Sequence, residues 1–329
     1  MSSARVTSRD VARRAGVSQS TVSYVLNDTP GQTISPDTRA RVRDAATELG
    51  YTPSAAARAL RAGRTDTVLV VVADVPVGDA TVAILGGLAR TVQPHGYTTV
   101  YQRRDGRDLR AVLRSLTPVA VADIGAFSPD EVAAAAERDV PVVGVSLDGI
   151  DGHVMRIPQD EIGRMQAEHL IARGRRRLAY AATDDALAGQ LMAGRIEGVR
   201  DACARHGLPA PLVVETPLYA DAARRAVDRL RDRADPVTGV CAFNDHVALA
   251  VSAGMRLAGL SAPADVAVVG VDDLPLARLV SPALTTVHVH NDDVGVALGR
   301  HVLRRLRPEL GVPEPDDEAT IHLVVRETT

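Results

Sequence analysis

The chain of 329 residues contains no Lys and no Trp, only two Cys, and only 2% aromatic residues. Cys203 and Cys241 are too few for a disulfide framework or a Cys-rich zinc site, so a reducing compartment is expected. The scarcity of rings leaves little with which to stack single-stranded bases or sugars. No apolar run reaches the roughly 18 residues needed to span a bilayer, and the first 14 residues lack the apolar core of a secretion signal. These absences predict a cytoplasmic protein that does not enter membranes.

Motifs of enzymes are missing as well. The sequence contains no Gly-x-Gly-x-x-Gly, no Walker loop and no Gly-x-Ser-x-Gly, and no nucleophile with a nearby base is recognisable. His169 and His206 stand alone on predicted helices, without a partner at the spacing of metal ligands, and are better explained as surface residues. We therefore predict no catalytic residue, no cofactor and no metal.

Charge is distributed unevenly along the chain. The overall net charge is −3, but residues 1–64 contain ten Arg against five Asp and Glu, a net of +5, and the remainder has a net of −8. A small basic segment on a larger acidic body indicates an anionic partner for the N-terminus. A local fluctuation in composition explains the charge alone equally well.

The first fifty residues predict three short helices. Thr7 and Asp10 have the spacing of a capping box, Ser18 and Ser35 are good N-cap residues, and Gly16 and Gly50 are helix stops. Two short helices around a glycine turn are a helix-turn-helix candidate. The second helix presents the polar residues Gln19, Ser20, Thr21, Ser23 and Tyr24, which suit base edges and phosphates in a major groove. The alternative is a three-helix module whose polar face is merely solvated.

Residues 51–64 contain a short Ala- and Arg-rich stretch after Ser54. It is too short for an isolated helix, so it should fold only against something else. Leu60, its one large apolar residue, lies between Arg58 and Arg61, and an apolar wedge flanked by cations is what kinking of a minor groove requires. The alternative is a plain Ala-rich linker.

These residues carry a family resemblance. Val6–Ser18, Ser20–Asn27 and Leu49–Arg58 closely resemble the headpiece and hinge of the lactose-repressor (LacI/GalR) family of bacterial transcription regulators. The resemblance implies binding of near-palindromic double-stranded operator DNA. The implied DNA-binding residues are Thr7, Ser18, Gln19, Ser20, Thr21, Ser23, Tyr24, Asn27, Ser54, Arg58 and Leu60. The chain departs from the family at Tyr24, where Arg is frequent, and in a longer loop at residues 28–34.

The body predicts parallel sheets. Val68–Val72 is a continuous apolar run, typical of a strand covered on both faces. Further runs alternate with helical stretches, which predicts helices on both sides of a sheet. These runs are Val119–Ile124, Val140–Val145, Leu178–Ala182, Val237–Ala242 and Val266–Val271. They are too many for one small sheet, so two subdomains are expected.

Polar residues follow three of the predicted strands, where ligands of open parallel sheets bind. They are Asn244 with Asp245, Asp272 with Asp273, and Ser146 with Asp148. Each is also a good helix cap, and capping alone would explain it.

The body extends the resemblance. Residues 243–250, 269–278 and 281–287 look like the family's effector domain, which has the fold of periplasmic sugar-binding proteins. The resemblance implies that Arg195, Asn244 and Asp272 hydrogen-bond a small polar effector and that Tyr219 places a ring against it, while a solvated helix arginine is the alternative for Arg195. Ser146 is also assigned to this site, where the family often has Asp. Val75–Ala80 and Pro158-Gln159 depart from the family pattern.

The expected fold is α/β, with an N-terminal all-α helix-turn-helix headpiece and two doubly wound parallel-sheet subdomains of periplasmic-binding-protein type. The headpiece would span 1–50, the hinge 51–64 and the effector-binding body 65–329. The subdomains would comprise about 65–156 plus 289–317, and 157–288 plus 318–329. The last predicted strand, Ile321–Arg326, is not followed by a leucine heptad, which favours a homodimer over a heptad-joined tetramer.

The predicted function is that of a sequence-specific transcription regulator, a repressor controlled by a small effector such as a sugar. The first alternative is a sugar-binding transport or receptor protein with the same body. The second is an enzyme on a doubly wound fold.

Overall fold

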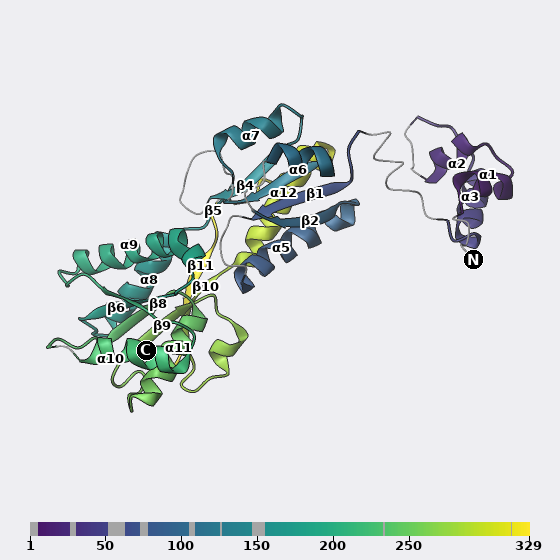
Figure 1. Ribbon diagram of the computed structural model, residues 1–329. Coiled ribbons are helices and arrows are strands. Elements are labelled where there is room, and N and C mark those ends of the chain that lie inside the picture. Colours follow the sequence, from purple (N-terminus) through teal and green to yellow (C-terminus); the bar gives the residue numbers. More distant parts are fainter. Residues whose placement is uncertain are drawn as a thin grey trace. The chain divides into compact units, whose positions relative to one another are not determined.

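The computed structural model describes residues 6–26, 31–51, 63–72, 78–104, 109–125, 127–146, 155–232, 234–316 and 318–329 (Figure 1). Its internal contacts divide the chain into two units, Met1–Thr65 and Asp66–Thr329. The predicted α/β fold class is confirmed, with helices in the first unit and two mainly parallel sheets in the second. No helix within the described ranges is long and apolar enough to cross a membrane.

The first unit contains the three predicted helices. They are α1 (Ser8–Ala15), α2 (Gln19–Leu26) and α3 (Pro36–Glu48). Their apolar faces meet in a small core formed by Val11, Ala12, Ala15, Val22, Val25, Val42, Ala45 and Ala46. The α1–α2 turn depends on Gly16, whose φ of 68° lies in the left-handed region that glycine adopts without a Cβ penalty.

The second unit contains two lobes, each defined by one sheet. The sheet of the first lobe has the order β2-β1-β3-β4-β5 and that of the second lobe β11-β10-β9-β8-β6-β7. The first sheet comprises β1 (Thr67–Val72), β2 (Thr98–Arg103), β3 (Ala120–Ile124), β4 (Val142–Ser146) and β5 (Met155–Arg156). The second comprises β6 (Leu178–Ala182), β7 (Leu212–Glu215), β8 (Gly239–Ala242), β9 (Ala267–Val271), β10 (Thr285–Val289) and β11 (Ile321–Val324). Only the β10–β11 pair is antiparallel among these described strands.

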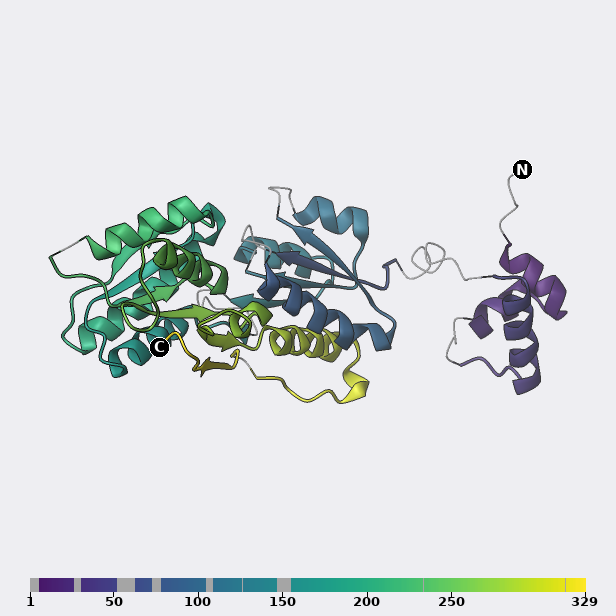
Figure 2. The same cartoon turned by 90° about the horizontal axis from the view of Figure 1, so that it is seen from below.

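Helices cover both sheets. The first lobe has α5 (Asp79–Val92), α6 (Leu109–Leu116), α7 (Pro129–Ala136) and α12 (Asn291–Leu306). The second lobe has α8 (Gln159–Ala172), α9 (Gly189–Arg205), α10 (Ala220–Arg231) and α11 (Asp245–Leu257). The described part of the body also contains the 3₁₀ turns η1 (Gln93–His95), η2 (Ala186–Ala188), η3 (Pro275–Arg278) and η4 (Pro308–Leu310). Helices α5 and α12 lie side by side in both views (Figure 1 and Figure 2).

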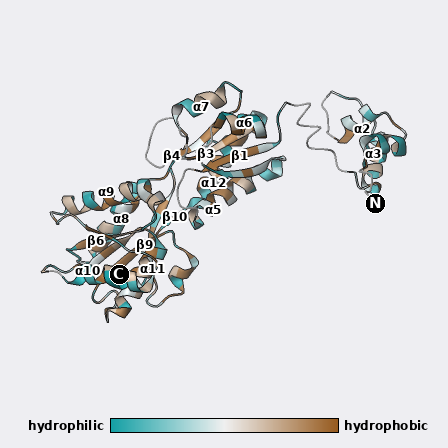
Figure 3. Ribbon diagram, in the orientation of Figure 1, coloured by the Kyte–Doolittle hydropathy of each residue, from teal (hydrophilic) through white to brown (hydrophobic). Residues whose placement is uncertain are grey.

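The hydrophobic cores lie between sheets and helices. All of Val68–Val72 is buried, and the strands carry most of the hydrophobic colour of the body in Figure 3. The predicted runs became strands, with starts displaced by up to two residues; the run predicted from Val140, for example, begins as β4 at Val142. The predicted runs did not include β2, β5, β7 and β10. No residue of the edge strand β2 is buried, so it does not form the continuous apolar run of a covered strand.

Three segments connect the lobes. One leads from β5 to α8, one from β10 to α12, and one from α12 back to β11. Two of them are joined where Arg156 and Glu318 form an isolated bridge and an ion pair of 2.8 Å. Because each lobe receives its chain in several pieces, residues far apart in sequence meet at the boundary between the lobes.

Candidate functional site

The surface of α2 is the candidate nucleic-acid interface. Val22 and Val25 are buried against the other helices, whereas Gln19, Ser20 and Tyr24 are exposed. The backbone N–H of Thr21 donates to Ser18 Oγ over 3.1 Å, so the predicted cap at the start of α2 is confirmed.

Several polar groups near α2 already have partners inside the unit. Gln19 Nε2 donates to Ser8 Oγ over 2.7 Å, and Ser18 Oγ lies 2.8 Å from Ser20 Oγ. Thr7 donates through its backbone N–H and its hydroxyl to Asp10, and these hydrogen bonds lower the pKa of the Asp10 carboxyl. The predicted DNA-binding residues Asn27, Ser54, Arg58 and Leu60 lie outside the described residues.

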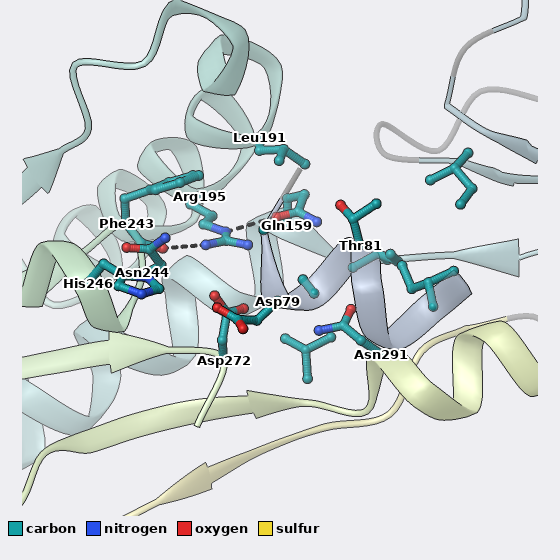
Figure 4. A pocket seen from close by; sticks show the side chains of 16 residues that line it. Asp79, Thr81, Gln159, Leu191, Arg195, Phe243, Asn244, His246, Asp272 and Asn291 are labelled. Atoms are coloured by element: carbon teal, nitrogen blue, oxygen red, sulfur yellow. Dashed lines mark hydrogen bonds between the residues drawn. The ribbon is translucent and has the colours of Figure 1, made fainter. Parts of the chain in front are cut away.

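A pocket between the two lobes is the second candidate site (Figure 4). It encloses about 840 Å³ of space, part of which is open to solvent, and so falls in the range of small-molecule sites. The first lobe and the segment after β5 contribute Gly78, Asp79, Ala80, Thr81, Ile84, Ile124, Ile157 and Asn291, and the end of β10 in the second sheet contributes Val289. The second lobe contributes Gln159, Leu191, Arg195, Phe243, Asn244, His246 and Asp272.

Arg195 is the one cation among the described residues that line this pocket, and it is only 6% exposed. Its Nε donates to Gln159 Oε1 over 2.9 Å, and its Nη1 donates to the carbonyl oxygen of Phe243. The guanidinium also lies 4.8 Å from the centroid of the Phe243 ring, at cation–π distance. The alternative of a solvated helix arginine is therefore wrong, because hydrogen bonds and a ring hold this side chain at the pocket wall.

Glycines in α8 and α9 create the space that positions Arg195. A Cβ on Gly163 would lie 1.9 Å from the carbonyl oxygen of Arg195, and a Cβ on Gly198 would lie 1.8 Å from that of Asp160. The two helices therefore approach at backbone distance, which brings Gln159 at the start of α8 within reach of the guanidinium. Sequence analysis noted Gln159 only as a departure from the family pattern.

Asp272 follows β9 and faces the pocket. Its φ of 106° is a conformation that residues other than glycine rarely adopt, and the N-cap of the following turn η3 is Leu274. The capping alternative for Asp272 is therefore wrong. Burial raises the pKa of its carboxyl to about 6, against the opposing influence of the Arg195 charge, and the negative charge of Asp79 raises it further.

The neighbouring Asp245 has a structural role. Its carboxylate is fully buried and accepts hydrogen bonds from Thr286 Oγ1 at 2.6 Å and from the backbone N–H of Leu274 at 2.8 Å. Burial raises its pKa to about 7. Asp245 thus joins the start of α11 to the strand ends beside it, and it does not line the pocket.

The remaining predicted effector residues differ in their placement. Asn244 lines the pocket, yet its Oδ1 also caps α11 by accepting from Val247 N over 3.0 Å, so its capping role is confirmed. Tyr219 is 73% exposed at the boundary of α10 and is not among the pocket residues. Ser146 ends β4, and its side chain lies outside the described part of the structure.

Several pocket residues carried no motif in the sequence. Asp79, Thr81, His246 and Asn291 lie near the starts of α5, α11 and α12, where polar residues are common as caps, so position alone did not distinguish them. Within the described ranges, no group of three or more His, Cys, Asp or Glu residues has an arrangement that holds a metal ion.

A helix-turn-helix unit joined to a two-lobed body defines a helix-turn-helix transcription regulator, and comparison with known proteins identifies its family. Residues 7–54 match the family model "Bacterial regulatory proteins, lacI family", and residues 167–329 match "Periplasmic binding protein-like domain". The regulator CelR of Thermobifida fusca is 32% identical over 340 residues, covering 98% of both chains. The repressor PurR of Vibrio vulnificus is 30% identical over 340 residues, again covering 98% of both. The solved CelR–cellobiose complex is similar, with a TM-score of 0.64 at 29% identity, covering 99% of this chain and 100% of that one. The chain belongs to the LacI family of bacterial transcription regulators.

Proposed function

We propose that this LacI-family regulator is a repressor that binds near-palindromic operator DNA as a homodimer and responds to a small polar effector. The observation that carries the proposal is the combination, in one chain, of a polar α2 surface and a polar-lined pocket between two lobes. The relative PurR is named a repressor, which supports the direction of control.

Base recognition is assigned to the exposed side of α2. Gln19, Ser20 and Tyr24 are the residues proposed to reach base edges, because they are exposed at the start of the second helix of the motif. Thr7, Ser18, Thr21 and Ser23 are proposed as phosphate contacts or supports. The roles of Asn27, Ser54, Arg58 and Leu60 remain predictions, with Leu60 as the wedge for the minor groove.

The pocket between the lobes is proposed as the effector site. Arg195 and Asp272 supply charged groups, and Asn244 and Gln159 supply amides, within a wall that includes the ring of Phe243. The bound cellobiose of the CelR structure supports a sugar as effector. Ser146 and Tyr219 remain predictions for this site. A change in lobe angle on binding would alter the geometry at the headpiece connection and thereby couple the two sites.

A second copy of the chain is the proposed partner. Leu276 and Leu279 near η3 are 49% and 75% exposed, and Val82 on α5 is 61% exposed. Large apolar side chains at such exposure favour burial against another protein surface. A homodimer would also present two headpieces to the two half-sites of a palindrome.

The test is selection of bound sequences from random DNA with the full chain, with and without cellobiose. We expect enrichment of a sequence with two-fold symmetry. Log affinity should fall with log salt, with a slope near −0.9 per neutralised phosphate. A selection that enriches no symmetric sequence would contradict the proposed operator binding.

A further inference from the structure

Two carboxylates reach the pocket from different lobes. Asp79 is the first residue of α5 in the first lobe, and Asp272 follows β9 in the second. Figure 4 shows both side chains directed into the same part of the pocket, below the guanidinium of Arg195. The negative charge of Asp79 is one cause of the raised pKa of Asp272, which is consistent with this closeness.

The pocket has an excess of negative charge. The described lining contains two carboxylates, Asp79 and Asp272, against the single guanidinium of Arg195. Arg195 already donates to Gln159 and to the carbonyl of Phe243. Neither Asp79 nor Asp272 has a side-chain hydrogen bond or ion pair with another residue in the described part of the chain. Two acceptor groups therefore face the pocket, and no described residue donates a hydrogen bond to either side chain.

The surroundings of these carboxylates strengthen the effect of their charge. Ile84, Ile124, Ile157, Leu191 and Val289 form an apolar part of the same wall. Charges interact more strongly beside apolar walls than in open water, because the effective dielectric constant is lower. A phosphate or carboxylate on a ligand would meet two like charges there, whereas hydroxyl or ammonium groups would supply the missing donors.

We propose that Asp79 is a specificity-determining residue of this pocket. Together with Asp272 it accepts hydrogen bonds from the hydroxyl or protonated amino groups of an effector that bears no negative charge, and it excludes phosphorylated and carboxylated ligands. The inference rests on the proposed effector function and specifies the chemical class of the effector.

The same pair relates ligand binding to closure of the lobes. Asp79 and Asp272 belong to different lobes, so closure of the lobes brings the two carboxylates together. Their repulsion opposes closure unless hydrogen-bond donors of a ligand lie between them. An effector that donates to both carboxylates removes this opposition and binds the closed arrangement more tightly. Because the effector binds the closed arrangement more tightly than the open one, it shifts the population toward the closed arrangement.

Asp79 also has a simpler explanation. A carboxylate in the first turn of a helix is favoured by the helix dipole, and Asp79 occupies that position in α5. Asp221, in the first turn of α10, has a comparable helix position but does not line the pocket. Asp221→Asn is therefore the matched control, because it removes a first-turn charge without changing the pocket.

The test measures binding of matched sugars to the full chain by calorimetry and thermal shift. The probes are cellobiose, D-glucose, D-glucosamine and D-glucose 6-phosphate. We expect wild type to bind an uncharged or amino sugar at least tenfold more tightly than the phosphate. Asp79→Asn should lower the affinity for the favoured sugar about tenfold, which is the usual order for losing a hydrogen bond to a charged acceptor. The variant should also discriminate less against glucose 6-phosphate. Asp221→Asn should leave both affinities unchanged.

The outcomes separate this inference from the function on which it rests. Tight binding of glucose 6-phosphate by wild type, or unchanged selectivity in Asp79→Asn, would overturn the role of Asp79 and leave the effector site intact. Binding of no probe by any variant would contradict the sugar effector itself, and the inference would fall with it. Small-angle scattering supplies a readout without ligand. The lobes of Asp79→Asn should be more closed than those of wild type at pH 7.5. Identical scattering would show that repulsion between the two carboxylates does not hold the lobes apart.

Discussion

Gly163 of α8 lies directly against the backbone of Arg195 in α9, so that a Cβ on the glycine would come within 1.9 Å of the arginine carbonyl oxygen. The contact explains how an arginine on a long helix becomes buried at the pocket wall. Two helices can approach so closely only where side chains are absent, and Gly198 provides the same clearance against Asp160. The position of the pocket's one described cation thus depends on glycines that do not themselves line the pocket.

Gly163→Ala should displace α9 and lower the free energy of unfolding by about 1–3 kcal/mol, because the added methyl overpacks a backbone contact. It should also weaken effector binding by moving Arg195 away from Gln159. Gly189→Ala is the control, since a Cβ on Gly189 meets no atom within 4 Å. Chemical denaturation of the three proteins measures the difference, and equal stability of both variants would show that α9 adjusts without cost.

Asp272→Asn should change the pH dependence of stability. The folded pKa is raised to about 6 from an ordinary value of 3.8, so the folded state holds the proton more tightly. This group therefore contributes stability at low pH that is lost as pH rises from about 4 through 6. Denaturant unfolding measures the free energy of unfolding of both proteins at pH 4 and at pH 7.5. The difference between Asp272→Asn and wild type should shift in favour of the variant by about 1–3 kcal/mol from the lower pH to the higher.

Asn244→Ala provides the contrast for that experiment. It removes the cap of α11 and should lower stability by about 0.5–2 kcal/mol at either pH. A difference between Asp272→Asn and wild type that does not vary with pH would contradict the raised pKa.

His288 should make the protein sensitive to acid. Its ring packs against His290 and His322, with centroids 4.4 and 5.1 Å away. Burial lowers the pKa of His288, the charges of the other two histidines lower it further, and Asp273 opposes them. The unfolded state therefore takes up a proton first as pH falls below about 6.5, and stability is lost in that direction.

His288→Gln should consequently lose less stability than wild type between pH 7.5 and pH 5.5. The exposed His206 allows a control, because His206→Gln removes an imidazole from outside the cluster. Urea unfolding at the two pH values measures the effect. If His288→Gln and His206→Gln respond to acid alike, the cluster does not control the sensitivity.

Tyr24→Ala should reduce affinity for the selected operator by roughly 1–3 kcal/mol and affect random DNA much less, because a contact to a base edge is lost. Tyr101→Ala is the matched control, since Tyr101 is 43% exposed and Tyr24 36% exposed. Gel-shift titrations on both DNAs measure the specificity ratio. Equal losses on operator and random DNA would assign Tyr24 to the DNA backbone.

Local features of this protein were predictable because they depend on near neighbours in the chain. The cap at Ser35 and the stop at Gly16 follow from hydrogen bonds and backbone angles within a few residues, and both are present. Val68–Val72 was predictable as a buried strand because continuous apolar runs suit a sheet covered on both faces. The α/β class followed from the alternation of such runs with helices.

The pocket was predictable only in part. Asp272 and Asn244 follow strand ends, and that position indicated a site, although capping explained it equally well. Packing decided between the two explanations: Asn244 does cap α11, while Asp272 has no such role and faces the pocket. Arg195 was undecided from sequence, because exposure of a helix residue depends on which helix covers it.

The sequence by itself determined the headpiece helices, the strands that form continuous apolar runs, and the family. Only the tertiary structure decided which polar residues meet. Arg195 donates hydrogen bonds to Gln159 and to the carbonyl oxygen of Phe243, which lie 36 and 48 residues away, and Asp79 and Asp272 line one pocket from different lobes. Helix and strand signals arise from neighbouring residues, whereas these meetings depend on the approach of α8 to α9 and on the course of the three connecting segments, which no local pattern encodes.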